Sequence, residues 1–146
     1  MDESQAIETL RSEKKQSLKR YRKNVECIAR LENKLASLDD RITGLRSPSL
    51  SGMPRGGTPV TVDDLLSDKL DLEDRIRRLK EKGRDLKREI CEEIDSITDT
   101  RYCEVLEAYF IECLEFEDIA DKLGYTERHV KRLYSEAITL LAVSGH

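Results

Sequence analysis

The side chains best suited to chemistry form a short run near the end of the chain. They are Thr126, Glu127, Arg128, His129, Lys131, Arg132 and Ser135, within the segment YTERHVKRLYSEA. Arginine and lysine carry positive charge and donate hydrogen bonds, so they can contact guanine edges or phosphates. Glutamate could accept from cytosine or stabilise a helix N-terminus. We expect this run to contact double-stranded DNA, with His129 as a polar surface or phosphate contact rather than a switch.

The residues around this run have the spacing of a helix-turn-helix. Ala120 is small where two crossing helices would touch, Gly124 suits the positive φ of a tight turn, and Val130 would anchor the second helix. Thr126 is a good N-cap. We predict that the helix 126–142 enters the major groove with its first two turns. The rest of its buried face would be Leu133, Ala137, Leu140 and Leu141. A helical pair without a DNA role could keep the same framework.

Two long helical arms precede this motif. Apolar residues recur at alternating steps of three and four from Ile28 to Leu45, and again from Val62 to Ile97, where Gly83 falls on the seam. Seven of the ten glycine and proline residues lie between Gly44 and Pro59, which predicts a linker over residues 44–61. We therefore predict an antiparallel coiled-coil hairpin, which could also pair with a second copy into a homo-oligomer such as a dimer.

Composition agrees with an all-α fold. The chain has 146 residues, of which 38% are charged and only 5% aromatic, as in long helices rather than one large core. No apolar stretch reaches the ~18 residues of a membrane span, so we expect a soluble cytoplasmic protein without membrane contact. The four cysteines are scattered, which favours structural thiols and no metal site. We expect no cofactor, no catalytic residues and no enzyme activity, because no phosphate-binding glycine loop or nucleophile–base pair is present.

Charge is distributed unevenly. Residues 99–146 hold five lysines and arginines against ten acidic residues, which opposes DNA binding by one copy. Three of those cations are gathered in residues 128–132, and two linked copies would raise the affinity through effective concentration. A second basic cluster could be a solvated helix face or could contact phosphates. These possible auxiliary contacts are Lys14, Lys15, Lys19, Arg20, Arg22 and Lys23.

The segment EFEDIADKLGYTERHVKRLYSEAITLL resembles the helix-turn-helix of region 4 of bacterial sigma factors, and CEVLEAYFIECL resembles the helix before it. Upstream, SPSLSGMPRGGTP followed by VDDLLSDKLDLEDRI is similar to small phage and prophage proteins related to late-operon regulators of the ArpU and RinA type. Glu115 departs from the sigma pattern, which often has a serine or threonine there as a helix cap. The sigma parts that bind the −10 element and the polymerase core are not recognisable.

The seam spacing and the resemblance together predict two regions: a helical coiled-coil and oligomerisation region over 1–98, then a sigma region 4-like domain over 99–146. The resemblance implies a sequence-specific transcriptional regulator of phage or prophage late genes in the bacterial cytoplasm, with bacterial RNA polymerase as a possible partner. One alternative is a coiled-coil adaptor that binds RNA polymerase or another protein without reading DNA. Another is a DNA-packaging adaptor like a small terminase subunit, although those usually place the DNA-binding motif first.

Overall fold

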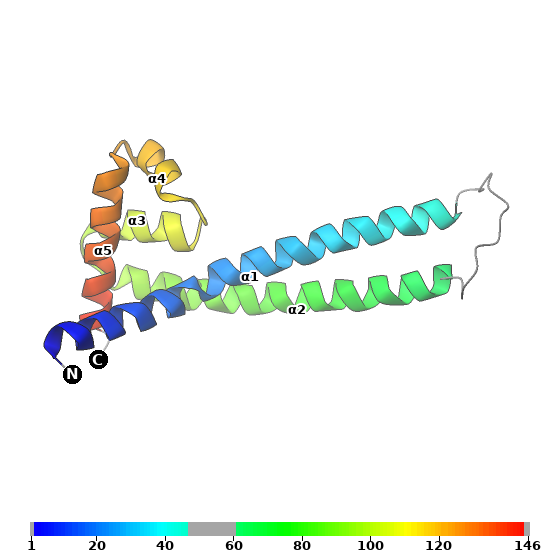
Figure 1. The fold of residues 1–146 in the computed structure, drawn as a ribbon, viewed down its shortest axis with the longest axis horizontal. Helices are drawn as coiled ribbons and strands as arrows, with labels where there is room; N and C mark the ends of the chain where they lie inside the picture. Colours follow the sequence, from blue (N-terminus) through cyan, green and yellow to red (C-terminus); the bar gives the residue numbers. More distant parts are fainter. Residues whose placement is uncertain (1, 47–60, 145–146) are drawn as a thin grey trace. The chain divides into compact units, whose positions relative to one another are not determined.

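All regular structure in the described residues is helical (Figure 1). The computed structural model describes residues 2–46 and 61–144. Its helices are α1 (Glu3–Arg46), α2 (Val62–Asp95), α3 (Thr100–Phe110), α4 (Phe116–Leu123) and α5 (Glu127–Ser144). The predicted all-α fold, with long helices followed by a short helical domain, is confirmed. None of these helices combines the length and apolarity that crossing a bilayer requires.

Most of the predicted linker, residues 47–60, lies outside the described residues. Its first part is helical, because Gly44 lies in the last turn of α1. A glycine costs a helix least near its end, where few backbone hydrogen bonds depend on it.

Contacts within the chain divide it into two compact units. One unit combines Met1–Asn24 with Gly83–His146, and the other is Val25–Lys82. Both long helices therefore contribute residues to each unit. The boundary that we predicted after residue 98 follows the sequence motifs, whereas the contacts group the start of α1 and the end of α2 with α3, α4 and α5.

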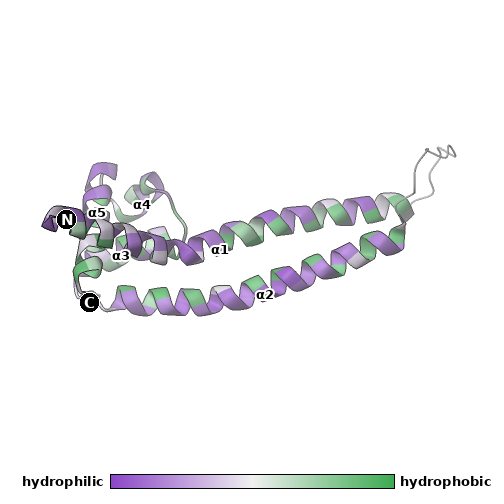
Figure 2. Ribbon diagram, turned by 60° about the horizontal axis from the view of Figure 1, so that its bottom comes forward, coloured by the Kyte–Doolittle hydropathy of each residue, from purple (hydrophilic) through white to green (hydrophobic). Residues whose placement is uncertain are grey.

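The unit Val25–Lys82 is a pair of antiparallel helical segments. Lys69 Nζ of α2 lies 2.8 Å from Asp39 of α1. Lys80 lies 3.6 Å from Glu32, so residue numbers rise along one helix as they fall along the other. In Figure 2, apolar and polar residues alternate along both helices, as the seam spacing predicts. A buried cluster on this seam consists of Leu38, Ile42 and Leu65, with Leu66 half-buried beside it.

The other unit has one hydrophobic core, which residues from all five helices build. Leu18 of α1 and Ile90 and Ile94 of α2 are fully buried in the same cluster as Phe110 of α3 and Ile119 of α4. Burying apolar side chains of this size stabilises a fold by roughly 1.5–3 kcal/mol each. The segment before residue 25 therefore completes the core against which the helix-turn-helix packs.

Gly83 allows a close approach between α1 and α2 inside this unit. An added Cβ at Gly83 would lie less than 3.0 Å from Oδ1 of Asn24, a distance that real Cβ atoms essentially never show. Asn24 is 7% exposed, so its amide has little room to move. The glycine on the predicted seam thus makes room for a buried polar side chain on the facing helix.

Candidate nucleic-acid interface

The turn between α4 and α5 has the geometry that its sequence predicts. Gly124 ends α4 in the left-handed conformation, with φ at +74°, where only glycine avoids a steric penalty. The backbone N–H groups of Gly124 and Tyr125 both donate to the carbonyl of Ala120, at 3.0 Å. The hydroxyl of Thr126 accepts from the backbone N–H of His129 at 3.1 Å, so Thr126 is the predicted N-cap of α5.

Two of the three predicted framework residues, Ala120 and Val130, are buried, whereas Gly124 is exposed in the turn. Val130 is fully enclosed, and Leu133 and Ala120 are also in the core. The predicted buried face of α5 is wrong at one position, because the side chain of Leu140 is 45% exposed. Leu140 falls at the edge of the buried arc, whose last turns are formed by Ile138, Leu141 and Ala142 instead.

The opposite side of α5 carries the predicted cations. Arg128, Lys131 and Arg132 are exposed, and His129 is half-buried. Lys131 Nζ pairs with Glu127 at 3.2 Å, one helical turn away. Arg132 Nη2 lies 2.9 Å from Nδ1 of His129, whereas Arg128 makes no ion pair or side-chain hydrogen bond among the described residues. The guanidinium of Arg128 is therefore the cation of this run that is most available to a ligand.

Four of these residues line one hollow at the start of α5. Its lining is Thr126, Arg128, His129 and Arg132, and its volume is about 500 Å³. The ring of Tyr125 meets that of His129 edge to face, with centroids 4.8 Å apart, and so supports the imidazole from the turn. Two guanidinium groups at a helix N-terminus favour an anion or a surface of acceptors, such as a phosphate or the major-groove edge of guanine.

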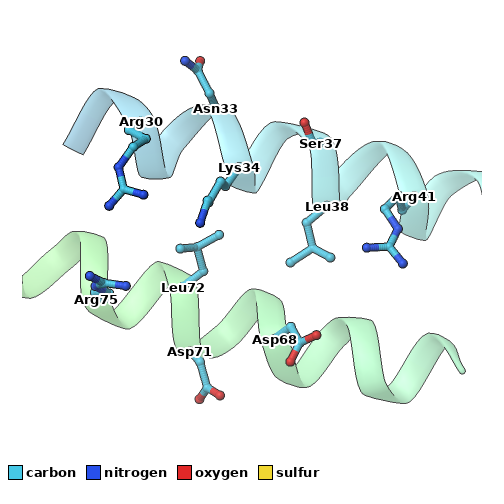
Figure 3. A pocket seen from close by; sticks show the side chains of 10 residues that line it. All are labelled: Arg30, Asn33, Lys34, Ser37, Leu38, Arg41, Asp68, Asp71, Leu72 and Arg75. Atoms are coloured by element: carbon cyan, nitrogen blue, oxygen red, sulfur yellow. The ribbon is translucent and has the colours of Figure 1, made fainter. Parts of the chain in front are cut away.

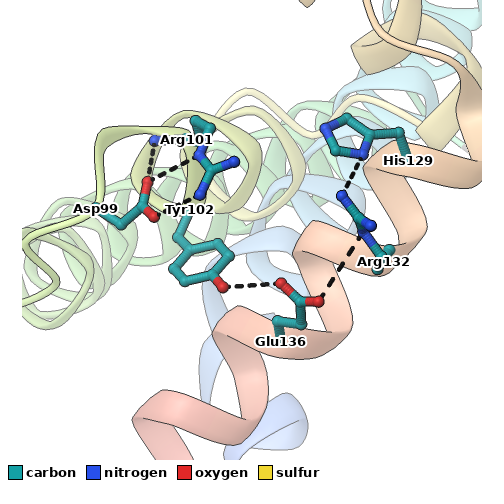
Figure 4. Close-up of polar contacts among 6 residues, drawn as sticks. All are labelled: Asp99, Arg101, Tyr102, His129, Arg132 and Glu136. Atoms are coloured by element: carbon teal, nitrogen blue, oxygen red, sulfur yellow. Dashed lines mark hydrogen bonds and ion pairs between the residues drawn. The ribbon is translucent and has the colours of Figure 1, made fainter.

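A carboxylate that the sequence analysis did not single out holds Arg132 from the other side. Figure 4 shows Glu136 between Tyr102 of α3 and Arg132 of α5. The Tyr102 hydroxyl donates to Glu136 at 2.8 Å, a hydrogen bond that raises the pKa of Tyr102. Arg132 Nε lies 3.9 Å from the same carboxylate. Spacing alone could have indicated the pair of residues 132 and 136, which are one turn apart, but not the contact with α3.

The side chain of Ser135 contacts α1. Its hydroxyl accepts a hydrogen bond from Arg11 Nη2 at 2.8 Å, in a partly buried contact. This position differs from the outward one that we predicted together with the cations. The reason is that α1 packs beside α5 at its third turn, which no pattern within α5 could reveal.

The basic cluster of α1 divides into cations with and without ion-pair partners inside this unit. Lys14 pairs with Glu93 of α2, and Arg20 Nη2 lies 3.4 Å from Glu89. Arg22 pairs with Glu115 at the start of α4. The remaining three residues, Lys15, Lys19 and Lys23, have no ion pair with any described residue and recur at every fourth position along α1.

Arg22 binds the turn between α3 and α4. Its Nη1 donates to the carbonyls of Tyr109 at 3.0 Å and Leu114 at 3.2 Å, and its Nη2 pairs with the carboxylate of Glu115. The guanidinium also lies 4.2 Å from the ring centre of Tyr109, a cation–π distance. In this turn Cys113 has a positive φ of 61°, which is costly for a side chain other than glycine.

This contact accounts for the departure at Glu115 from the sigma pattern. Glu115 is the N-cap residue of α4, yet its side chain makes no capping hydrogen bond. Its carboxylate binds Arg22 instead. The start of α4 is therefore held by a cation from α1 rather than by a hydroxyl cap.

Aromatic side chains fix the angles among α3, α4 and α5. The ring of Tyr109 stacks on Phe116 and meets Phe110 and Tyr134 edge to face, with all three centroid distances between 4.9 and 5.0 Å. Burial raises the pKa of Tyr134 to about 12. Such contacts add to the energy of simple area burial, so they orient α5 as well as bury it.

A second hollow in the same unit has the opposite charge. It has a volume of about 610 Å³ and is lined by Cys91, Glu104, Glu107, Ile111, Glu112, Lys122 and Leu123. Lys122 pairs with Glu112, whereas Glu104 and Glu107 have no cationic partner in the part of the chain that the structure describes. This surface would repel phosphates, so nucleic acid would have to approach the unit from its α5 side.

The cysteines are half-buried and unbridged. Burial raises the pKa of Cys91 and Cys103, which keeps both as neutral thiols. The Sγ of Cys103 lies 3.3 Å from the carbonyl of Ile97. Within the described ranges, no three histidine, cysteine or carboxylate side chains are gathered so that they could hold a metal ion.

Comparison with known proteins bears on the helices that carry the cationic hollow. A family model described as Sigma-70, region 4 matches residues 99–142, a range that includes α3, α4 and most of α5. No curated protein and no solved structure matches the chain. Residues 99–142 thus form a sigma-70 region 4 domain, a helix-turn-helix of the DNA-binding type.

Proposed function

We propose that this protein is a sequence-specific transcriptional regulator that reads the DNA major groove with the first two turns of α5. The observation that carries the proposal is the two-sided character of this helix. Val130 and Leu133 are buried in the core, while Arg128 and Arg132 line an open hollow on the other side. A helix held in this way can enter a groove without losing its packing.

Within this proposal the side chains of α5 have different roles. Arg128, which has no ion pair or side-chain hydrogen bond within residues 2–46 and 61–144, contacts a guanine edge or a phosphate. Arg132 does the same from a position held by His129 and Glu136. Lys131 and Glu127 form an ion pair with each other. Either side chain must therefore break this ion pair before it can contact DNA. Thr126 uses its hydroxyl as a cap, and its place at the helix start suits a phosphate contact.

The net negative charge of the region around the motif limits the affinity of one copy. Three cations of α1, Lys15, Lys19 and Lys23, would add phosphate contacts outside the recognition helix. A homodimer formed through the long helices would add a second motif and multiply the affinity. We accordingly propose that residues 1–98 supply oligomerisation and that residues 99–146 supply DNA recognition.

The biological setting rests on the resemblance of the upstream segments to small phage and prophage regulators. It supports control of phage or prophage late genes in a bacterial cytoplasm. We also propose that the region 4 domain contacts bacterial RNA polymerase, as region 4 of sigma factors does.

The test is a DNA-binding selection from random duplexes with the full chain, followed by affinity measurements at two salt concentrations. Arg128→Ala should relax the preference at one base pair, at a cost of about 1–3 kcal/mol on the selected site if it binds a base. If Arg128 binds a phosphate, the salt dependence should fall by about one phosphate contact without a change in sequence preference. Arg88→Ala, which removes an exposed cation from α2, is the matched control and should leave both quantities unchanged.

The adaptor function makes the opposite prediction, and the acidic hollow around Glu104 and Glu107 is the observation in its favour. An adaptor would enrich no sequence, and Arg128→Ala would bind duplex DNA as weakly as the unchanged protein. That outcome would refute DNA reading by α5.

A further inference from the structure

A groove runs between the two helices of the unit Val25–Lys82, on one side of their apolar seam (Figure 3). Its volume is about 760 Å³. The lining from α1 is Arg30, Asn33, Lys34, Ser37, Leu38 and Arg41, and the lining from α2 is Asp68, Asp71, Leu72 and Arg75. None of these residues belongs to the region 4 domain or to the proposed DNA contacts.

The floor of the groove is apolar. Leu72 is half-buried and Leu38 is only 9% exposed, so the seam is open to solvent mainly at Leu72. A pair of antiparallel helices packs its apolar side chains toward each other and leaves a channel along each flank. A third helix fits such a channel, with leucine-like side chains inserted between those of the pair.

The walls of the groove carry cations that have no carboxylate partner among the described residues. Arg30, Lys34 and Arg41 follow one another along one side of α1, and Arg75 faces them from α2 (Figure 3). None of the four lies within 4.0 Å of a carboxylate oxygen of the described residues. Elsewhere on the same pair of helices, Lys69 and Lys80 do form such pairs, with Asp39 and Glu32.

Two acids, Asp68 and Asp71, offset part of this charge, but both belong to the α2 wall. Every charged residue of the α1 wall is therefore a cation, and the groove as a whole keeps an excess of positive charge. A helix bound in the groove would face only cations on the α1 side. On the α2 side it would face both acidic side chains and Arg75. This asymmetry would select both the charge and the orientation of the occupant.

We propose that this groove binds an acidic amphipathic helix of a partner protein. Leucine-type side chains of the partner pack on Leu38 and Leu72, and its carboxylates pair with Arg30, Lys34 and Arg41. The apolar floor favours a helix over nucleic acid, whose backbone gains nothing from leucine contacts. The same groove of a second copy is an unsuitable occupant, because two surfaces with excess positive charge repel each other.

The proposal can be tested with the full chain and a synthetic helical peptide of roughly three heptads, with leucine at the a and d positions and glutamate at the e and g positions. A fluorescent label on the peptide would report binding by anisotropy. The peptide should bind the unchanged protein at least about tenfold more tightly than the same peptide with lysine in place of glutamate.

Two variants test whether the groove is the site. Arg30→Glu combined with Arg41→Glu should weaken the acidic peptide about tenfold or more. Lys82→Glu combined with Arg84→Glu changes the net charge equally at exposed positions outside the groove and should have little effect. Ser37→Trp adds bulk at an exposed groove position and should block the peptide while the unfolding temperature stays the same.

Several results would overturn the proposal. One is equal affinity for the acidic and the basic peptide, or no binding of either. Another is unchanged peptide binding in the Arg30/Arg41 double variant. If that variant loses affinity for duplex DNA and not for the peptide, the groove is a nucleic-acid surface instead. If it changes only the oligomeric state, the occupant is a second copy of the chain.

Discussion

Replacing Gly83 with alanine tests the close approach of α2 to Asn24 on α1. In an open helical site this change stabilises a protein by about 1 kcal/mol, because glycine is the poorer helix former. At Gly83 the new Cβ would lie less than 3.0 Å from Oδ1 of Asn24, and the buried amide must move. Overpacking of this kind costs typically about 1–3 kcal/mol. We expect a net loss of about 1 kcal/mol.

The effect of Gly83→Ala on stability should change from a loss to a gain when the clash with Asn24 is removed. In the background of Asn24→Ala the atoms nearest to the new Cβ are gone, and the next neighbour, Cε1 of Tyr21, lies at 3.8 Å, an ordinary contact distance. Gly83→Ala should then stabilise the protein by about 1 kcal/mol. The two backgrounds should therefore differ by about 2 kcal/mol, which is a typical coupling energy for residues in direct contact.

The assay is urea unfolding followed by helical circular dichroism, at one fixed protein concentration, for the four proteins of the cycle. Gly44→Ala is the control, because nothing lies within 4 Å of a Cβ built at Gly44. Gly44→Ala should stabilise the protein slightly, and by the same amount with Asn24 present as in the Asn24→Ala background. A coupling energy near zero between positions 24 and 83 would show that these helices do not meet as described.

Three further predictions concern the unit that holds the helix-turn-helix. Arg22→Ala should lower the free energy of unfolding by about 2–3 kcal/mol in denaturant titrations, because two partly buried carbonyls and the carboxylate of Glu115 lose their donor, whereas Arg22→Lys should lose less. Ser135→Ala should leave DNA affinity in a filter or anisotropy assay unchanged, since its hydroxyl faces Arg11, and a large loss would contradict that position. The raised pKa of Tyr134 means that the folded state keeps a proton that the unfolded state loses, so stability should be intact below pH 10 and fall as pH rises toward 12. Tyr134→Phe should lessen that alkaline loss in unfolding curves measured from pH 9 to 12, and an unaltered loss would assign it to other groups.

Much of the helix-turn-helix could be predicted from the sequence because its determinants are local. The turn at Gly124 is predictable because a positive φ is costly for any residue with a Cβ. The N-cap at Thr126 is predictable because its hydroxyl bonds a backbone N–H only three residues later. The buried side of α5 follows from helical periodicity, apart from Leu140 at its edge. Each of these features depends on residues within one or two turns.

The long helices were also predictable, since a repeat of three and four is a property of the sequence itself. The same repeat could not tell which residues of α1 would pack with which unit. Leu18 lies before the regular repeat, which begins at Ile28, yet it is fully buried in the core of the unit that holds the helix-turn-helix. Its burial depends on helices that follow it by more than seventy residues.

The residues themselves determined the helices, the turn at Gly124 and the cationic side of α5, because those features follow from backbone sterics and periodicity over a few neighbours. Only the tertiary structure decided which polar groups remain available to a ligand. Ser135 accepts a hydrogen bond from Arg11, which is 124 positions away in the sequence. Glu115 accepts one from Arg22, which is 93 positions away. A side chain's partners across such distances depend on how separate helices pack, which no local pattern encodes.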